Sequence, residues 1–371
     1  MWVTSSLSTI HAPTVIALGN FDGVHRGHER VMEPILSSGA GDLAKTPSWA
    51  EARADLTLPP IWGYSDRTPL LLDSCDGQGP AHWSHPPQPP MGLPRSTPTP
   101  TVVTFYPHPQ EFFSGTPRPW LTPLDEKATL LRALGVQQLV LLPFNPELAT
   151  LSPEAFVEKI LIHCLQARHI SVGADFRFGH RREGTAARLK TLAAPHGVTV
   201  TVVDLAQAGG DRISSSRIRE ALWTGDLAMA RQLLGRPYAI SGRVVQGQQL
   251  GRQLGFPTAN LRVPMEKCLP RTGVYGVQVY GIPGSSPQCP LTGVMNLGVR
   301  PTVAGQTQTL EVHVLDWAGD LYGQTLTVTL EAFLRPEQRF DSLDQLKAQI
   351  QTDCQRARAL LRVGNRPEVR A

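Results

Sequence analysis

Short apolar runs separated by helix-like segments occupy the first two thirds of the chain. Each run has the length and β-branched content of a buried strand. They are TVIAL (14–18), TVVTF (101–105), QQLVLLPF (137–144), HISVG (169–173) and VTVTVVDL (198–205). Residues with helical spacing follow the first run, so 14–36 is predicted to form a strand, a loop and a helix. LSPEAFVEKILIHCL (151–165) is predicted to form another helix. This alternation predicts an α/β domain with a Rossmann-like parallel sheet covered on both faces.

The pattern of apolar and polar residues changes after Pro237. The segment ISSSRIREALWTGDLAMARQLL (213–234) is predicted to be one helix, opened by serines and ended at Gly235. Beyond it lie short alternating segments separated by Gly and Pro turns, which indicate a small antiparallel barrel or sandwich. These segments are ISGRVVQG, TGVYGVQVYG, LTGVMNLG, LEVHVLDW and LTVTLEAFL. A final helix, with apolar residues at 343, 346, 350 and 360/361, is expected to pack on the barrel.

Two domains are therefore expected, over 1–236 and 237–371, as the length of 371 residues also suggests. The segment 38–100 shows neither the strand–helix alternation nor the short alternating strands, because it carries 12 of the 33 prolines. We expect a disordered or loosely attached insertion there. Its three tryptophans leave a partner-docking role as the alternative to a tolerated surface insertion.

Charge and cysteine content narrow the class of protein. The net charge of +4 suits the handling of anionic small molecules and gives no reason to expect a nucleic-acid partner. The five cysteines are far apart and form no CxxC pair, which favours a reducing compartment. No signal peptide and no apolar run of membrane-spanning length are recognised. We therefore expect a cytoplasmic protein without a membrane partner, and its oligomeric state, self-association included, stays open.

The stretch GNFDGVHRGH (19–28) joins the first strand to the first helix. Ligands of open α/β sheets bind at the carboxyl ends of strands, near helix N-termini. Glycines let a phosphate approach the backbone there, and His25 and His28 can donate to the same phosphoryl oxygens. Metal binding and a purely structural role are the alternatives, although the spacing differs from the i,i+4 pair of zinc helices.

Three further stretches add to the evidence for a phosphate site: TFYPHP (104–109), VGADFRFG (172–179) and ISSSRIR (213–219). The HxGH element resembles that of the nucleotidyltransferase superfamily. Together with the three stretches, it resembles the adenylyltransferase module of the prokaryotic bifunctional riboflavin kinase/FAD synthetases. That resemblance implies transfer of AMP from ATP to FMN, giving FAD and pyrophosphate, with FAD as a product rather than a bound redox cofactor.

The resemblance also assigns roles within this module. It implies that Asn20 holds the nucleotide and Asp22 a Mg²⁺ ion, with turn formation as the alternative for both. The first turn of the predicted 213–234 helix is expected to grip the triphosphate, the alternative being an ordinary N-cap followed by a solvated arginine. The residues concerned are Ser214, Ser215, Ser216 and Arg217. By resemblance, the flavin pocket is lined by Phe105, His108, Asp175 and Arg177, and a place in the strand core is the equal alternative for Phe105.

The barrel half contains GRQLGFPTANLRV (251–263), which is glycine-rich but lacks the Walker A pattern. It resembles the riboflavin kinase family, whose PTAN segment supplies Mg²⁺ ligands and whose glycine loop closes over ADP. The resemblance assigns Thr258 and Asn260 to the metal, and hard oxygen ligands suit Mg²⁺. The residues assigned to the phosphate loop are Gly251, Arg252 and Gly255. Taken alone, PTAN would by default be a turn whose Asn side chain satisfies the local backbone.

The segments MNLGVRPTV (295–303) and LEVHVLDWAGDLYG (310–323) extend this resemblance. By resemblance, Glu311 is the general base that takes the proton of the riboflavin 5′-hydroxyl. A solvent-facing strand glutamate is the alternative. VVQGQQLG (244–251) departs from the family, where a histidine-glycine-aspartate precedes the phosphate loop.

The whole chain is thus interpreted as a bifunctional transferase that uses riboflavin, FMN, ATP and Mg²⁺. A flavin-binding protein without turnover, and a nucleotidyltransferase with another acceptor fused to an unrelated β-module, are the rival interpretations.

Overall fold

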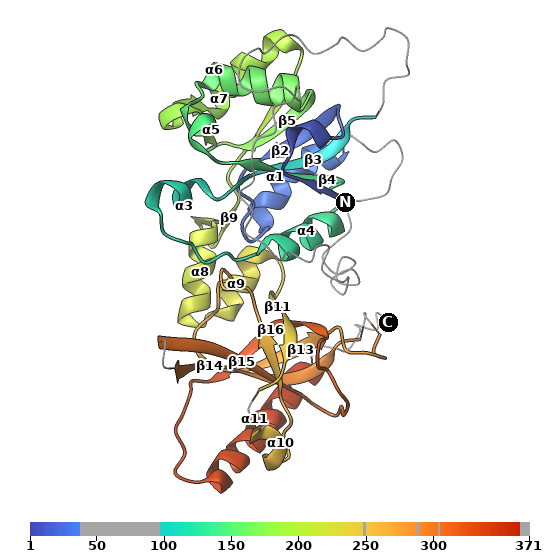
Figure 1. The fold of residues 1–371 in the computed structure, drawn as a ribbon, viewed down its shortest axis with the longest axis vertical. Helices are drawn as coiled ribbons and strands as arrows, with labels where there is room; N and C mark the ends of the chain where they lie inside the picture. Colours follow the sequence, from blue (N-terminus) through green and yellow to red (C-terminus); the bar gives the residue numbers. More distant parts are fainter. Residues whose placement is uncertain (38–96, 248–249, 287–288, 303–304, 364–371) are drawn as a thin grey trace. The chain divides into compact units, whose positions relative to one another are not determined.

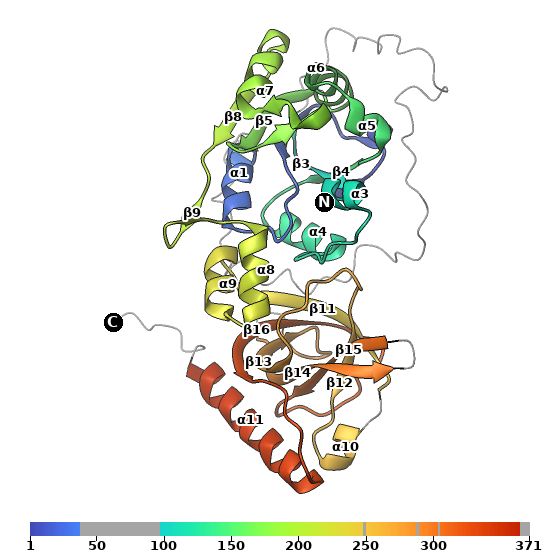
Figure 2. The same ribbon diagram turned by 90° about the vertical axis from the view of Figure 1, so that its left-hand side faces the viewer.

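A computed structural model describes residues 1–37, 97–247, 250–286, 289–302 and 305–363. It divides into two compact units, drawn in Figure 1 and, from the side, in Figure 2. Among the described residues, the first unit holds 1–37, 97–118 and 127–213, and the second holds 119–126 and everything from 214 onward. Most of the predicted insertion 38–100 lies outside the described residues. Its last two residues belong to a strand, because β3 begins at Thr99.

The first unit is built on a six-stranded sheet in the order β1-β4-β3-β2-β5-β8, and every neighbouring pair is parallel. This confirms the predicted α/β architecture. The strands are β1 (Trp2–Thr4), β2 (Thr14–Leu18), β3 (Thr99–Tyr106), β4 (Gln138–Pro143), β5 (Ala167–Gly173) and β8 (Thr199–Val203). Only the edge strand β1 was not predicted. All five residues of β2 are buried, as a strand in the middle of a covered sheet requires.

Helices and two small hairpins complete this unit. The helices are α1 (Arg26–Ser37), α3 (Pro109–Ser114), α4 (Leu124–Ala133, its first turn in the second unit), α5 (Pro146–Thr150), α6 (Pro153–Ala155) and α7 (Ala186–Ala193). Short 3₁₀ turns cover Leu7–Thr9, His180–Arg182 and Ala194–His196, and the hairpins are β6 (Arg177–Phe178) with β7 (Gly184–Thr185) and β9 (Gln207–Ala208) with β10 (Asp211–Arg212). The helix predicted over 151–165 is confirmed, but Phe156–Cys164 is wound as a π-helix.

The order of the strands locates a binding edge. From β2 the chain moves outward through β3 to β4, and later continues on the opposite side of β2 through β5 to β8. Such a reversal leaves a crevice at the carboxyl ends of the central strands, where open α/β sheets bind their ligands. The loop 19–25 leaves β2 at that edge and enters α1.

The second unit is built on a closed antiparallel barrel in the order β11-β12-β15-β14-β13-β16. Its strands are β11 (Tyr238–Val245), β12 (Ala259–Arg262), β13 (Gly273–Tyr280), β14 (Leu291–Thr302), β15 (Gly305–Val314) and β16 (Thr325–Arg335). Helix α11 (Leu343–Val363) packs outside β13, β14 and β16 (Figure 2), and α10 (Leu250–Leu254) is one short turn. The predicted barrel with a terminal helix is confirmed.

The single helix predicted over 213–234 is wrong, because the chain forms α8 (Ser215–Thr224) and α9 (Leu227–Leu234). Gly225 ends α8 in the left-handed conformation with φ of 83°. The side chain of Asp226 then caps the new helix by accepting a hydrogen bond from the Met229 amide. The glycine and the capping aspartate stop one helix and start another within two residues.

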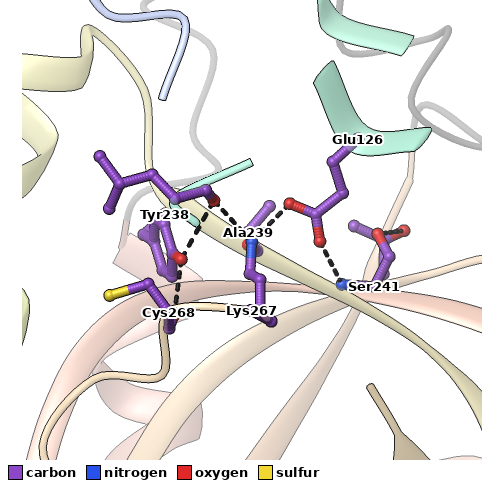
Figure 3. A network of polar contacts seen from close by, with 8 residues as sticks. Glu126, Tyr238, Ala239, Ser241, Lys267 and Cys268 are labelled. Carbon is purple, nitrogen blue, oxygen red and sulfur yellow. Dashed lines mark hydrogen bonds and ion pairs between the residues drawn. The ribbon is translucent and has the colours of Figure 1, made fainter. Parts of the chain in front are cut away.

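A buried polar network fixes residues 119–126 within the second unit (Figure 3). The Lys267 ammonium is ion-paired with Glu126 and donates to the carbonyls of Leu121, at 2.9 Å, and Ala239, at 2.8 Å. The second carboxylate oxygen of Glu126 accepts the amide of Ser241 at 3.1 Å. Burial raises the pKa of Glu126, and Lys267 counteracts that rise. Because each charge has partners, the network is satisfied although it is almost fully buried.

Candidate active sites

The loop that leaves β2 is held by its backbone. The amide of Gly19 donates to the Val103 carbonyl at 3.1 Å. The Asn20 carbonyl accepts from Thr104 Oγ1 and from Lys127 Nζ, each at 3.0 Å. Phe21 and Val24 are both buried and adopt left-handed φ values of 48° and 40°, which ordinary residues rarely keep without support. The loop therefore has a defined shape that its surroundings enforce.

The two histidines of this loop are brought together as a stacked pair. Their ring centroids are 3.6 Å apart and the planes are inclined by 13°. The amide of each donates to Nδ1 of the other at 3.3 Å. Because Nδ1 accepts in both, the neutral ring carries its proton on Nε2. Two stacked rings that each offer an N–H donor at a helix N-terminus are suited to an anion.

The described residues contain no group of three or more His, Cys, Asp and Glu side chains able to hold a metal ion. Gly27 has a separate reason to be glycine, because a Cβ there would meet the His25 ring at 3.1 Å. Asp22 is 8% exposed, and its charge acts on both Lys127 and His108. Asn20, by contrast, is exposed.

The loop after β3 carries His108 and an aromatic cluster. His108 caps α3, because its Nδ1 accepts the amide of Gln110 at 3.1 Å. Burial, followed by the charge of Arg118, lowers the pKa of His108 to about 4, so the ring is neutral at neutral pH. Phe105 packs against the core of the sheet and meets Phe144 edge-on at 5.7 Å.

Sequence analysis missed the rest of this cluster. Phe112 and Phe113 also pack edge-on against Phe144, and Phe113 is 72% exposed. An exposed aromatic beside a cluster of rings is suited to stacking on a planar ligand. The QEFF stretch directly after TFYPHP was the available signal.

The other two predicted contributors lie at the exposed end of β5. Asp175 follows that strand and forms an ion pair with Arg212. Arg177 opens the hairpin strand β6 and is exposed.

The serines of ISSSRIR belong to the start of α8. Ser214 is the N-cap, and its Oγ accepts the amide of Arg217 at 3.4 Å. Ser215, Ser216 and Arg217 form the first turn, where backbone N–H groups have no partner within the helix itself. By its contacts α8 is part of the second compact unit, whereas the two histidines are part of the first.

In the barrel, three side chains share one row across three strands. Asn260 and Glu311 were predicted from the sequence, and Asn296 was not. Asn260 of β12 lies opposite Glu311 of β15, and Glu311 lies opposite Asn296 of β14. Residues directly opposite each other in a sheet point to the same face, with Cβ atoms about 5 Å apart. All three are half-buried. The carboxylate of Glu311 therefore has an amide side chain on either side. Asn296 was missed because only the strand register brings it to Glu311.

The PTAN segment is held against this row. Nδ1 of His313 donates to the Pro257 carbonyl at 2.8 Å, and its ring meets Phe256 edge-on. Thr258 and Asn260 follow directly, half-buried, and offer the oxygen atoms that Mg²⁺ prefers. The predicted phosphate loop differs in form, because Gly251 and Arg252 lie in the short helix α10 and only Gly255 lies in a turn, with φ of 85°.

Gly247 allows the backbone to approach the Asn260 side chain, since a Cβ there would clash with Asn260 Nδ2. Its own φ is not left-handed, so alanine is conformationally acceptable. We expect Gly247→Ala to displace Asn260 and lower the turnover supported by the barrel site roughly 10-fold. Gly276→Ala is the matched control, because its Cβ meets neighbours only at 3.7–3.8 Å. Equal turnover of the two variants at the barrel site would contradict this packing.

Comparisons with known proteins match both regions of the chain to known families. The riboflavin kinase family model matches residues 234–361, and the FAD synthetase model matches 7–45 and 95–217. The bifunctional riboflavin kinase/FMN adenylyltransferase of Escherichia coli K12 is 38% identical over 341 residues, 91% of this chain and 90% of its own. The protein of the same description from Pseudomonas fluorescens is also 38% identical, with 94% of each chain covered.

A solved structure covers nearly the same length. It comes from Streptococcus pneumoniae, is titled a macrolide-efflux protein, and has a TM-score of 0.70 at 26% identity. It covers 96% of this chain and 98% of its own. In the part of this chain that the structure describes, no helix is long and apolar enough to cross a membrane.

Proposed function

The chain belongs to the family of bifunctional riboflavin kinase/FMN adenylyltransferases, and we propose how its residues divide the two reactions. As a transferase of this family it phosphorylates riboflavin with ATP to give FMN, then joins FMN to AMP from a second ATP to give FAD. One observation carries the division: the FAD synthetase match contains the histidine loop, and the riboflavin kinase match contains the Asn260–Glu311–Asn296 row.

The proposed boundary between the two functions falls at residues 236 and 237. The adenylyltransferase region then includes α8, whose serines are the expected triphosphate grip, although α8 packs with the second unit. The FAD synthetase match supports this assignment, because it ends at residue 217 and so still includes Ser214, Ser215, Ser216 and Arg217. The kinase region begins with β11.

For the kinase, we assign proton transfer to Glu311. The riboflavin 5′-oxygen attacks the γ-phosphorus of ATP, the bond from that phosphorus to the bridging oxygen of ADP breaks, and the hydroxyl proton passes to the Glu311 carboxylate. Asn260 and Asn296 lie opposite Glu311 on the two neighbouring strands, which puts their side chains on the same face of the sheet as that carboxylate. Gly251, Arg252 and Gly255 are assigned to the ATP phosphates.

For adenylyl transfer, no covalent nucleophile on the enzyme is needed. A phosphate oxygen of FMN attacks the α-phosphorus of ATP, and the bond from that phosphorus to the pyrophosphate oxygen breaks. The two Nε2–H groups of His25 and His28 are placed to stabilise the charge that develops on the phosphoryl oxygens. Asn20 and the start of α8 are assigned to the nucleotide. Phe105, His108, Asp175 and Arg177 are assigned to the flavin.

Mg²⁺ fits the donors present at both sites. Thr258 and Asn260 would hold it in the barrel, and the carboxylate of Asp22 would hold it in the first unit. A bound Mg²⁺ neutralises phosphate charge and orients the triphosphate. The proposed location is the cytoplasm, which is supported by the absence of a disulfide bond among the four described cysteines.

The by-products of the reaction distinguish this function from its rivals. With FMN and ATP, the purified protein should release pyrophosphate in step with FAD and form no ADP. With riboflavin and ATP, ADP should appear first and pyrophosphate should follow. Flavin binding without either by-product would favour a binding protein, and pyrophosphate release with an acceptor other than FMN would favour a different transferase.

A further inference from the structure

Two buried side chains converge on one backbone atom beneath the histidine loop. Thr104, at the end of β3, and Lys127, on α4, both donate to the Asn20 carbonyl at 3.0 Å. They are 2% and 4% exposed, whereas Asn20 itself is exposed. Two buried donors therefore hold the Asn20 carbonyl in place, while Asn20 itself stays exposed to solvent.

Lys127 is an unusual residue for a structural hydrogen bond alone. Burying an ammonium is costly, and a neutral donor could satisfy the same carbonyl. The surroundings explain the charge, because the carboxylates of Asp22 and Glu111 favour its protonated form against the desolvation that lowers its pKa. Asp22 lies two residues after Asn20 in the same loop.

We infer that Lys127 and Thr104 are positioning residues of the adenylyl-transfer site, which hold Asn20, Asp22 and the loop leading to the histidine pair in their reactive arrangement. This inference rests on the proposed function. Neither residue carries a role in the family resemblance, and neither is assigned to contact substrate. Their effect passes through a loop whose left-handed residues, Phe21 and Val24, need external support.

The test uses Lys127→Met, Thr104→Val and the double variant in the full chain. We expect Lys127→Met to lower kcat for FAD formation from FMN about 30-fold and Thr104→Val about 5-fold, with KM for FMN within about threefold of the parent. Because both act through one carbonyl, the double variant should lose much less than the product of the two factors. Riboflavin phosphorylation should be unchanged, and Lys190→Met, on an exposed lysine of α7, is the matched control.

Each result decides the inference. An unchanged kcat in Thr104→Val and Lys127→Met, or fully multiplicative losses, would overturn it. If Lys127→Met does not fold, Thr104→Val decides alone, since it removes a hydroxyl and preserves shape. A parent protein that forms no FAD from FMN would instead refute the proposed function, which keeps the two failures distinct.

Discussion

Glu311→Gln should lower riboflavin phosphorylation about 10³-fold and leave the conversion of FMN to FAD unchanged. Glutamine keeps the shape of the side chain and its place between Asn260 and Asn296, but it cannot take up the hydroxyl proton. KM for riboflavin should change little, because the substitution removes a transition-state role rather than a binding surface. The measurement is steady-state formation of FMN, with FAD formation from FMN as the control within the same chain.

Glu266→Gln provides a matched barrel variant, because Glu266 is exposed and its backbone carbonyl, which accepts the Trp120 amide, is unchanged by the substitution. It should phosphorylate riboflavin at the parental rate. Wild-type turnover in Glu311→Gln would remove Glu311 as the base and leave the alternative of an ordinary strand glutamate.

His28→Asn should produce the reciprocal result, with FAD formation from FMN lowered about 10³-fold and riboflavin phosphorylation retained. Asparagine can still accept the His25 amide through its side-chain oxygen, so the helix start keeps its hydrogen bond. It cannot place a donor where His28 Nε2–H lies. A larger loss in His28→Ala than in His28→Asn would measure the additional contribution of that amide contact.

His196→Ala is the control for this prediction, because His196 is an exposed residue of the same unit. It should form FAD normally. Parental FAD formation by His28→Asn would leave His25 and His28 as structural residues. Loss of both reactions in a folded His28 variant would contradict the assignment of separate sites.

The apolar pattern alone was sufficient for most of the fold. The five predicted strands of the sheet were short buried runs, and such runs are readable because both faces of a parallel sheet are covered. The edge strand β1 was not readable, since it has only three residues and just one of them is buried. The break between α8 and α9 was visible as Gly225-Asp226, but the helical spacing on either side obscured it.

The candidate sites show a similar limit. Side chains within motifs, such as the histidine pair and Glu311, were found because the motif lies in one continuous stretch. Asn296 reaches Glu311 only through strand register, and Lys127 reaches Asn20 only through folding of α4 against the loop. Neither spacing nor composition encodes such a contact, so a positioning residue distant in sequence stays invisible until the fold is known.

The central claim, that one chain carries two independent sites, is tested most directly by mixing two damaged proteins. Glu311→Gln with riboflavin, ATP and Mg²⁺ should leave riboflavin unconverted, and His28→Asn should stop at FMN. An equimolar mixture of the two should accumulate FAD, because FMN made by one protein is the substrate of the other. If the mixture forms no FAD, although each variant alone retains its remaining reaction, the two sites do not work independently and the account is contradicted.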